Sequence, residues 1–151
     1  MSEALQPFDP ALVIARIAGQ VPGLREIGGA AESDAAYARP GAVPAAYVIV
    51  AAEKKDDSRF TELREVVTEV ELDVLVVVRN YRAAERGLAH TEAVRPVVGA
   101  IRAALNGWRP TMPAGVRAET MRSKGRCHVI RFDQAHLWWM DKYALEYRSR
   151  L

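Results

Sequence analysis

The residues from Val66 to Val78 alternate between two chemical characters with a period of two. The even positions are apolar or threonine throughout, whereas the odd positions are mostly acidic at first and apolar later. Successive side chains of a strand point to opposite faces, so the pattern predicts a β-strand, and its length exceeds that of most globular strands. Three acidic side chains, Glu69, Glu71 and Asp73, are then expected to project beyond whatever covers the second face of the sheet.

Two amphipathic helices are predicted, one on each side of this strand. The first follows Asp9 and Pro10, which are typical of an N-cap and a first helical residue, and it ends before Pro22. The second has apolar residues at helical spacing over 94–105. Pro96 fits only a first turn, so this helix is expected to begin near Arg95 or to be kinked there.

Several further segments have strand character. The apolar run 45–52 is of strand length and rich in β-branched residues, which predicts a strand buried on both faces. A weak short strand is expected near 24–31, followed by a helical turn or loop over 32–39. The charged segment 53–64 is expected to be a connection, and segments 116–123 and 127–132 are expected to form two strands joined across 123–126.

The terminal segment, His136 to Arg150, carries two of the three tryptophans. As a helix it would stack Trp139, Tyr143 and Tyr147 at i,i+4 spacing, but its aromatic content and hairpin context favour a strand. In a strand the two tryptophans must point to opposite faces. We expect Trp139 to lie in the core and Trp138 to lie at or near a subunit contact.

These elements together predict an α+β fold, with a mostly antiparallel sheet of about five strands and two main helices packed on one face. The chain of 151 residues is the right size for a single domain, 1–151. No apolar run approaches the roughly 18 residues that a membrane span needs, and the N-terminus lacks the features of a signal peptide, so a cytosolic origin is expected.

Charge is unevenly distributed along the chain. Residues 1–75 contain 13 acidic and 7 basic residues, whereas residues 76–151 contain 6 and 14. If folding keeps the halves apart, the molecule has two poles, and copies of one chain can meet head to tail. If folding interleaves the halves, the asymmetry disappears.

Candidate catalytic residues are few. Glu53 and Lys55 follow a buried strand and, with Asp34, reproduce the pattern of a magnesium-dependent nuclease, but this spacing is common at strand ends and a solvated loop is the simpler interpretation. Cys127 is the only cysteine, and no pair among the three histidines has i,i+4 spacing. We therefore expect no enzyme activity, metal or cofactor.

A nucleic-acid-binding module is the other alternative. Arg122, Lys124 and Arg126 lie close together in the sequence, and Trp138 and Tyr143 could stack on bases. The acidic half of the chain largely offsets this positive charge, which argues against a surface that follows phosphates.

The order of the elements resembles that of the tail terminator, or tail completion, proteins of long-tailed bacteriophages and prophages. The resemblance extends from about Leu12 to Tyr147 and depends on element order and on three patches: 71–81, 104–110 and 137–147. No single motif is diagnostic.

The resemblance implies a structural virion protein. Such a protein forms a ring, typically a hexamer, at the head-proximal end of the tail, where it stops polymerisation of the tail tube. Its implied partners are other copies of itself, the tube protein, a head-completion or neck protein and also the tail sheath, with DNA only passing through the ring. Assembly is expected in the cytoplasm of the host bacterium.

Such a ring needs two different complementary surfaces on each subunit. The acidic row of the long strand is one candidate, and arginines of the neighbouring subunit are its expected partners. The predicted interface residues are Glu69, Glu71, Asp73, Arg79, Arg82, Trp138 and Arg148.

Overall fold

The structure is a computed structural model that describes residues 6–56, 65–79, 89–132 and 135–150. The helices are α1 (Ala11–Gln20), α2 (Ala30–Ala38) and α3 (Ala89–Leu105). The strands are β1 (Glu26–Gly28), β2 (Ala45–Asp56), β3 (Glu65–Arg79), β4 (Val116–Ala118), β5 (Arg122–Ser123), β6 (His128–Phe132) and β7 (His136–Arg150).

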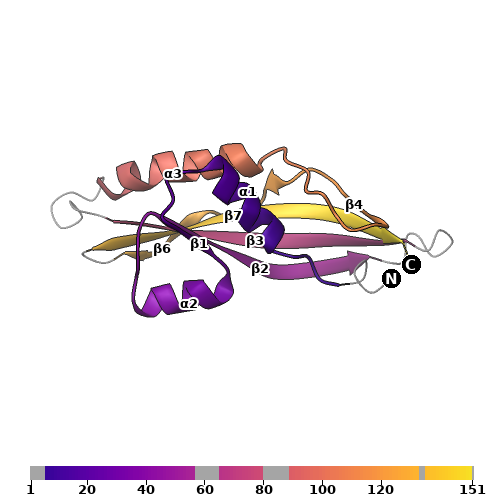
Figure 1. Cartoon of the computed structure of the whole chain (residues 1–151), viewed down its shortest axis with the longest axis horizontal. Helices are drawn as coiled ribbons and strands as arrows, with labels where there is room; N and C mark the ends of the chain where they lie inside the picture. Colours follow the sequence, from indigo (N-terminus) through magenta and orange to yellow (C-terminus); the bar gives the residue numbers. More distant parts are fainter. Residues whose placement is uncertain (1–5, 57–64, 80–88, 133–134, 151) are drawn as a thin grey trace.

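The strands form one sheet in the order β1-β2-β3-β7-β4, and β5 and β6 also pair with β7 (Figure 1). Only β1 and β2 run parallel; all other pairs are antiparallel. The α+β class is therefore confirmed, with a sheet of more strands than the five expected.

Strands β3 and β7 form the centre of the sheet and pair along their whole length, from Glu65 opposite Arg150 to Arg79 opposite His136. Strand β3 was predicted from its alternating residues and β7 from its aromatic content and hairpin context, and the faces predicted for their side chains are also confirmed. The even-numbered residues of β3 from Val70 to Val78 lie in one core with the odd-numbered residues Leu137, Tyr143, Leu145 and Tyr147 of β7.

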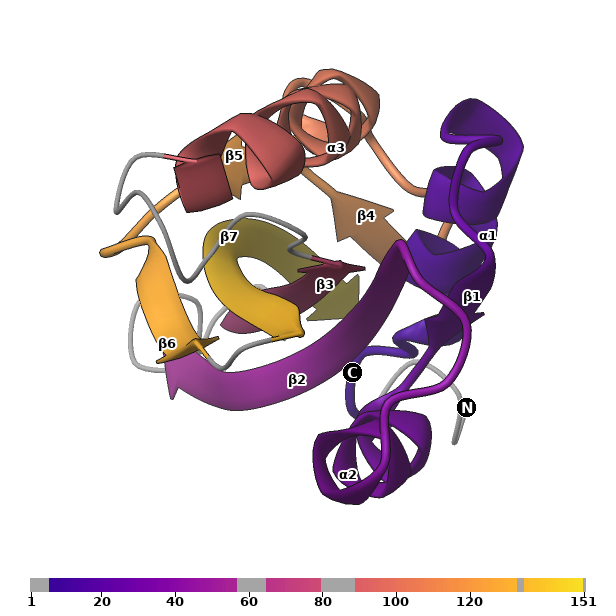
Figure 2. The ribbon, with the colours of Figure 1, turned by 90° about the vertical axis from the view of Figure 1, so that its left-hand side faces the viewer.

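Helices α1 and α3 cover this first face of the sheet. Val13 and Ile17 of α1 and Ile101 and Leu105 of α3 are fully buried in the same core as Val74. The short helix α2 lies on the opposite face, as Figure 2 shows, where its Ala36 packs in a second, smaller core. The sequence indicated two main helices and a helical turn or loop at the position of α2, which is a helix of nine residues.

Three local predictions were wrong. Strand β2 continues through the charged residues Glu53–Asp56, because β3 pairs with it up to Val67 and supplies the hydrogen bonds that a loop would lack. Helix α3 begins at Ala89 and not near Arg95, and it contains Pro96, so of the two alternatives only a kink at Pro96 stays a prediction. Proline removes one helical hydrogen bond, but the helix keeps an apolar stripe against the sheet, where Val94 and Val98 are buried.

The third wrong prediction concerns the segment after α3. Strands β4, β5 and β6 do not pair with one another but lie one after another along β7. Helix α3 ends as predicted, with Gly107 at φ 80° in the left-handed region that glycine tolerates.

The two adjacent tryptophans point to opposite faces, but their predicted burial is reversed. Trp138 is 0% exposed and lies beneath α2, with the Tyr37 ring at 5.2 Å and the Tyr47 ring at 6.1 Å. Trp139 is only partly buried, against the main core. Trp138 is thus covered by its own chain and has no exposed area for a neighbouring subunit.

Candidate functional site: a charged half of the second sheet face

The second face of the sheet has two halves of different character. One half lies under α2 and contains Tyr47, Leu75, Val77 and Trp138. Beyond it the same strands present charged side chains on the same face. We call these residues the charged half-face: Lys54 on β2; Glu69, Glu71 and Asp73 on β3; Lys142, Glu146 and Arg148 on β7; and Arg117 on β4.

The strand pattern explains this arrangement. Residues directly opposite each other in an antiparallel pair point to the same face. Glu69 lies between Lys54 and Glu146, and Asp73 lies opposite Lys142. The alternation of β3 therefore places Glu69 and Asp73 next to charged residues of other strands, whereas Glu71 lies between Ala52 and Ala144.

Two of the three acids have basic partners within their own chain. Lys124 Nζ donates to a Glu69 carboxylate oxygen, and Arg122 Nη2 lies 3.6 Å from the other. The hydrogen bond from Lys124 lowers the pKa of Glu69. Lys142 Nζ donates to Asp73 Oδ1 at 3.0 Å.

Glu71 differs from its two neighbours. Its side chain is exposed, and the described part of the chain offers it no ion-pair partner. Of the predicted acidic row, Glu71 is thus the member left for contact with another molecule.

The predicted basic partners are placed differently. Arg79 lies at the far end of β3, opposite His136, well away from the acids. Arg148 lies on the charged half-face, with Nη2 3.9 Å from Glu146 Oε1. Arg82 lies outside the described residues.

Lys142, Lys124 and Arg122 were not predicted as partners of the acids. The position of Lys142 beside Asp73 follows from the pairing of β7 with β3, which the local sequence does not indicate. Arg122 and Lys124 were noticed as a basic cluster and were considered for nucleic-acid binding instead. Only the pairing of β5 with β7 brings them near β3.

Asp141 forms a second polar cluster, on the helix-covered face. Its side chain is 1% exposed, and it accepts hydrogen bonds from Arg102 of α3, from the Tyr143 hydroxyl at 2.6 Å and from Trp139 Nε1 at 3.1 Å. Burial alone would raise the pKa of Asp141, but these hydrogen bonds lower it overall. The cluster attaches α3 to β7 and is buried, which fits a structural role.

The nuclease pattern is not assembled. Glu53 points to the helix-covered face, where it accepts hydrogen bonds from the Phe8 N–H at 2.6 Å and the Tyr147 hydroxyl at 3.4 Å. Asp34 lies on α2, on the opposite face of the sheet, and Lys55 is exposed at the edge. Among the described residues, no three His, Cys, Asp or Glu side chains are grouped closely enough to hold a metal ion.

The nucleic-acid interpretation loses its stacking residues. Trp138 is 0% and Tyr143 is 1% exposed, so neither can stack on a base. Arg122 and Lys124 form ion pairs with Glu69.

Within the described residues no helix is both long and apolar enough to cross a membrane.

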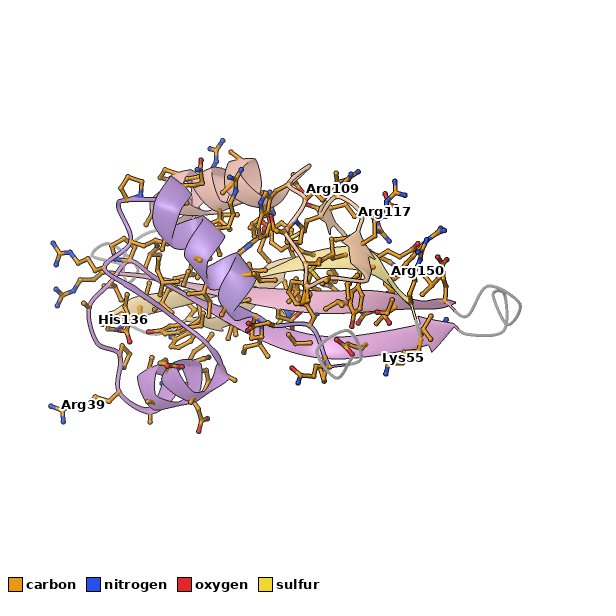
Figure 3. All side chains as sticks on the ribbon, turned by 45° about the vertical axis from the view of Figure 1, so that its right-hand side comes forward. Arg39, Lys55, Arg109, Arg117, His136 and Arg150 are labelled. Carbon is orange, nitrogen blue, oxygen red and sulfur yellow. The ribbon has the colours of Figure 1, made fainter. Side chains whose placement is uncertain are left out.

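The strands from the two halves of the sequence occupy different sides of the sheet. Strands β1, β2 and β3 come from the first half of the chain and occupy one side of the sheet, whereas β7 and β4–β6 occupy the other. The segment from Arg109 to Arg131 contains six basic residues and one acidic residue. Figure 3 shows Arg109, Arg117 and Arg150 near one another at one end of the molecule and Lys55 on β2 at the same end.

The fold defines a class: an α+β protein whose notable surface is a charged sheet face. The sequence profile described as "Phage tail terminator protein" matches residues 3–150, nearly the whole chain. The chain belongs to the phage tail terminator family and is a structural protein of a phage-type tail.

A solved structure has a similar fold. It is a chain of the "Virion of native gene transfer agent (GTA) particle", with 15% sequence identity and a TM-score of 0.50 over 92% of this chain and 86% of that chain. No curated protein matches.

Proposed function

We propose that this protein forms a ring, a hexamer, which caps the head-proximal end of a tail tube. The ring stops polymerisation of the tube and offers a docking surface to the head-completion or neck protein, and to the sheath in tails that have one. DNA passes through the ring without being bound in a sequence-specific way. Assembly takes place in the host cytoplasm.

One observation carries the proposal: the family match over residues 3–150, in a chain whose sheet has two chemically different sides. A closed ring built from heterologous contacts needs two different complementary surfaces on every subunit. The separation of the acidic and basic halves across the sheet is consistent with this requirement.

Fewer of the predicted interface residues belong to the interface proposed here. Glu69 and Asp73 are held by lysines of their own chain, and Trp138 is buried. Glu71 and Arg148 remain as interface candidates on the charged half-face, and Arg79 remains as a candidate at the opposite end of the sheet.

Two measurements test the proposal. Light scattering on the purified protein is expected to detect a species of about six times the 16.7 kDa chain, alone or after addition of tail tubes. Electron microscopy of tubes mixed with the protein is expected to show caps at one tube end and an arrest of elongation. A protein that stays monomeric and leaves tube elongation unchanged would contradict the proposal.

A further inference from the structure

Both edges of the sheet are open at the end that carries the charged half-face. Strand β1 covers β2 only from Ala45 to Tyr47, and beyond Tyr47 no described backbone group bonds to the outer side of β2. The exposed part of this edge includes Ala51, Ala52, Lys54 and Lys55.

The opposite edge at the same level is formed by β4. It pairs with β7 only, from Val116 opposite Ser149 to Ala118 opposite Tyr147. The ladder continues to Glu119, whose N–H donates to the Glu146 carbonyl at 2.8 Å. No described backbone group bonds to Arg117, Ala118 or Glu119 on the side away from β7.

Two rows of residues cross the sheet between these edges. The first row is Lys54, Glu69, Glu146 and Glu119. The second row is position 56, which is an aspartate, then Val67, Arg148 and Arg117.

Each row ends at its two edges on residues of opposite charge. In the first row the β2 edge is basic and the β4 edge is acidic, and in the second row these signs are exchanged. Inside the chain, Glu69 lies opposite Glu146 and Arg148 lies opposite Arg117, and like charges directly opposite each other are unfavourable.

We infer that the β2 edge of one copy pairs with the β4 edge of a second copy, with Lys54 opposite Glu119 of that copy. Because β2 runs parallel to β7, and β4 runs antiparallel to β7, the two edges meet as an antiparallel pair when the sheet faces are aligned. Residue numbers then change in opposite directions, so the register that joins Lys54 to Glu119 also joins position 56 to Arg117. Both rows match in a single register.

The side chains at this contact are available. Lys54 is exposed. Among the described residues the ion-pair partner of Glu119 is Arg109 at 4.0 Å, and 47% of the Glu119 side chain is exposed. Lysines on an open strand hinder pairing with unrelated edges, and a partner with an acid in register removes that obstacle. The contact joins two different edges, so it repeats head to tail, and such a repeat forms a ring when the rotation between successive copies closes.

This inference rests on the proposed ring, because it names the surfaces that form it. The test uses two single charge reversals, Lys54→Glu and Glu119→Lys. Each variant alone places like charges at every contact, and we expect about tenfold weaker association at each contact and loss of the ring.

The mixture of the two variants is the decisive sample. The glutamate introduced at position 54 of the first variant then lies opposite the lysine introduced at position 119 of the second variant. The unchanged Lys54 of the second variant lies opposite the unchanged Glu119 of the first variant. The copies alternate around the ring, so an equimolar mixture is expected to regain rings of one-to-one composition. Native mass spectrometry, with light scattering and with tube-end capping, measures this.

Lys55→Glu is the matched control. It changes the net charge equally on the same edge but on the other face of the strand, and it is expected to leave the ring intact. Thermal unfolding checks that all variants are folded. Wild-type-like rings from the single variants, or a mixture that stays dissociated, would overturn the inference while the ring itself stands; absence of any wild-type ring or cap would overturn the proposed function.

Discussion

Under α2, strands β2, β3 and β7 present Tyr47, Val77 and Trp138, none more than 1% exposed. A few residues along the same strands, on the same face, they present Lys54, Glu69 and Lys142. Strands β3 and β7 pair without interruption across the two halves, whereas β2 has a register shift between Val50 and Ala52. Helix α2 covers one half only. Helix α2, which is nine residues long, therefore marks the boundary between the buried core on this side of the sheet and the charged half-face.

The two halves stabilise the protein to different extents. Burial of large apolar side chains contributes roughly 1.5–3 kcal/mol each, whereas exposed ion pairs contribute about 0–1 kcal/mol. The charged half-face thus adds little to folding and is free to serve recognition. Substitutions in the half under α2 are expected to change stability most, and substitutions on the charged half-face are expected to change it least.

Replacing Trp138 by alanine is expected to cost about 3–5 kcal/mol of unfolding free energy, because it leaves a cavity beneath α2. Urea unfolding measures this. Trp138→Phe is the informative companion, because Trp138 Nε1 is buried and has no hydrogen-bond partner among the described residues. Removing this unpaired N–H offsets part of the lost area, so the phenylalanine variant should be clearly more stable than the alanine variant. A loss below about 1 kcal/mol for Trp138→Ala would show that α2 is not the cover described above.

Replacing Asp141 by alanine is expected to cost about 2 kcal/mol, because it leaves the Tyr143 hydroxyl and Trp139 Nε1 without their acceptor. Arg102 can reach water, since 44% of its side chain is exposed, which limits the loss. Chemical unfolding at neutral pH measures it. Arg102→Met is the matched variant: it keeps the packing of the long side chain and removes the charge.

Asp141 also predicts a pH dependence. Its pKa is lowered in the folded protein, so its contribution is fully present above the unfolded value of about 4 and is lost as the pH falls through the folded pKa. The stability difference between the wild type and Asp141→Asn should therefore shrink below about pH 4. A difference that is constant from neutral to acidic pH would show that the charge of Asp141 contributes nothing.

On the charged half-face, Lys142→Ala is expected to lower the free energy of unfolding by at most about 1 kcal/mol, because the Lys142–Asp73 pair is only partly shielded from water. The loss should fall further in high salt, which screens exposed charges. Unfolding at low and high salt concentration measures both. A loss comparable to that of Trp138→Ala would remove the distinction between the two halves.

Glu71→Gln is expected to have the smallest effect, within about 0.5 kcal/mol, because Glu71 is exposed and has no ion-pair partner among the described residues. If the charged half-face contacts another subunit or the tube, the same variant should weaken assembly although its stability is unchanged. Light scattering and tube-end capping, compared with thermal unfolding, separate these outcomes. Unchanged stability together with unchanged assembly would exclude Glu71 from the contact.

The predictable part of the fold was the part with strong local patterns. Alternation predicted β3, and aromatic content and hairpin context predicted β7. Once each was taken as a strand, its side chains were assigned to the correct faces, because the direction of a side chain along a strand depends only on position parity. Glu53 to Lys55 were predicted as a loop because charge usually indicates solvent. Their pairing with Thr68 to Val70 is a long-range interaction that leaves no trace in the local sequence.

The candidate site, like the fold, was predictable only where the local pattern is strong. The acidic row of Glu69, Glu71 and Asp73 and its exposure were visible in the sequence, but the partners of two of these acids were not. Lys124 and Glu69 are far apart along the chain and meet only because β5 and β3 flank β7. The sequence therefore indicated a charged face without indicating which of its charges remain available.

The sequence by itself determined the family, the α+β class, the two central strands and the opposite directions of Trp138 and Trp139. Tertiary structure alone decided that α2 covers Trp138, that lysines of the same chain hold Glu69 and Asp73, and that the acidic and basic halves lie on opposite sides of one sheet. The physical reason is that periodicity sets where a side chain points relative to its own backbone, whereas the packing of distant segments sets what it meets there.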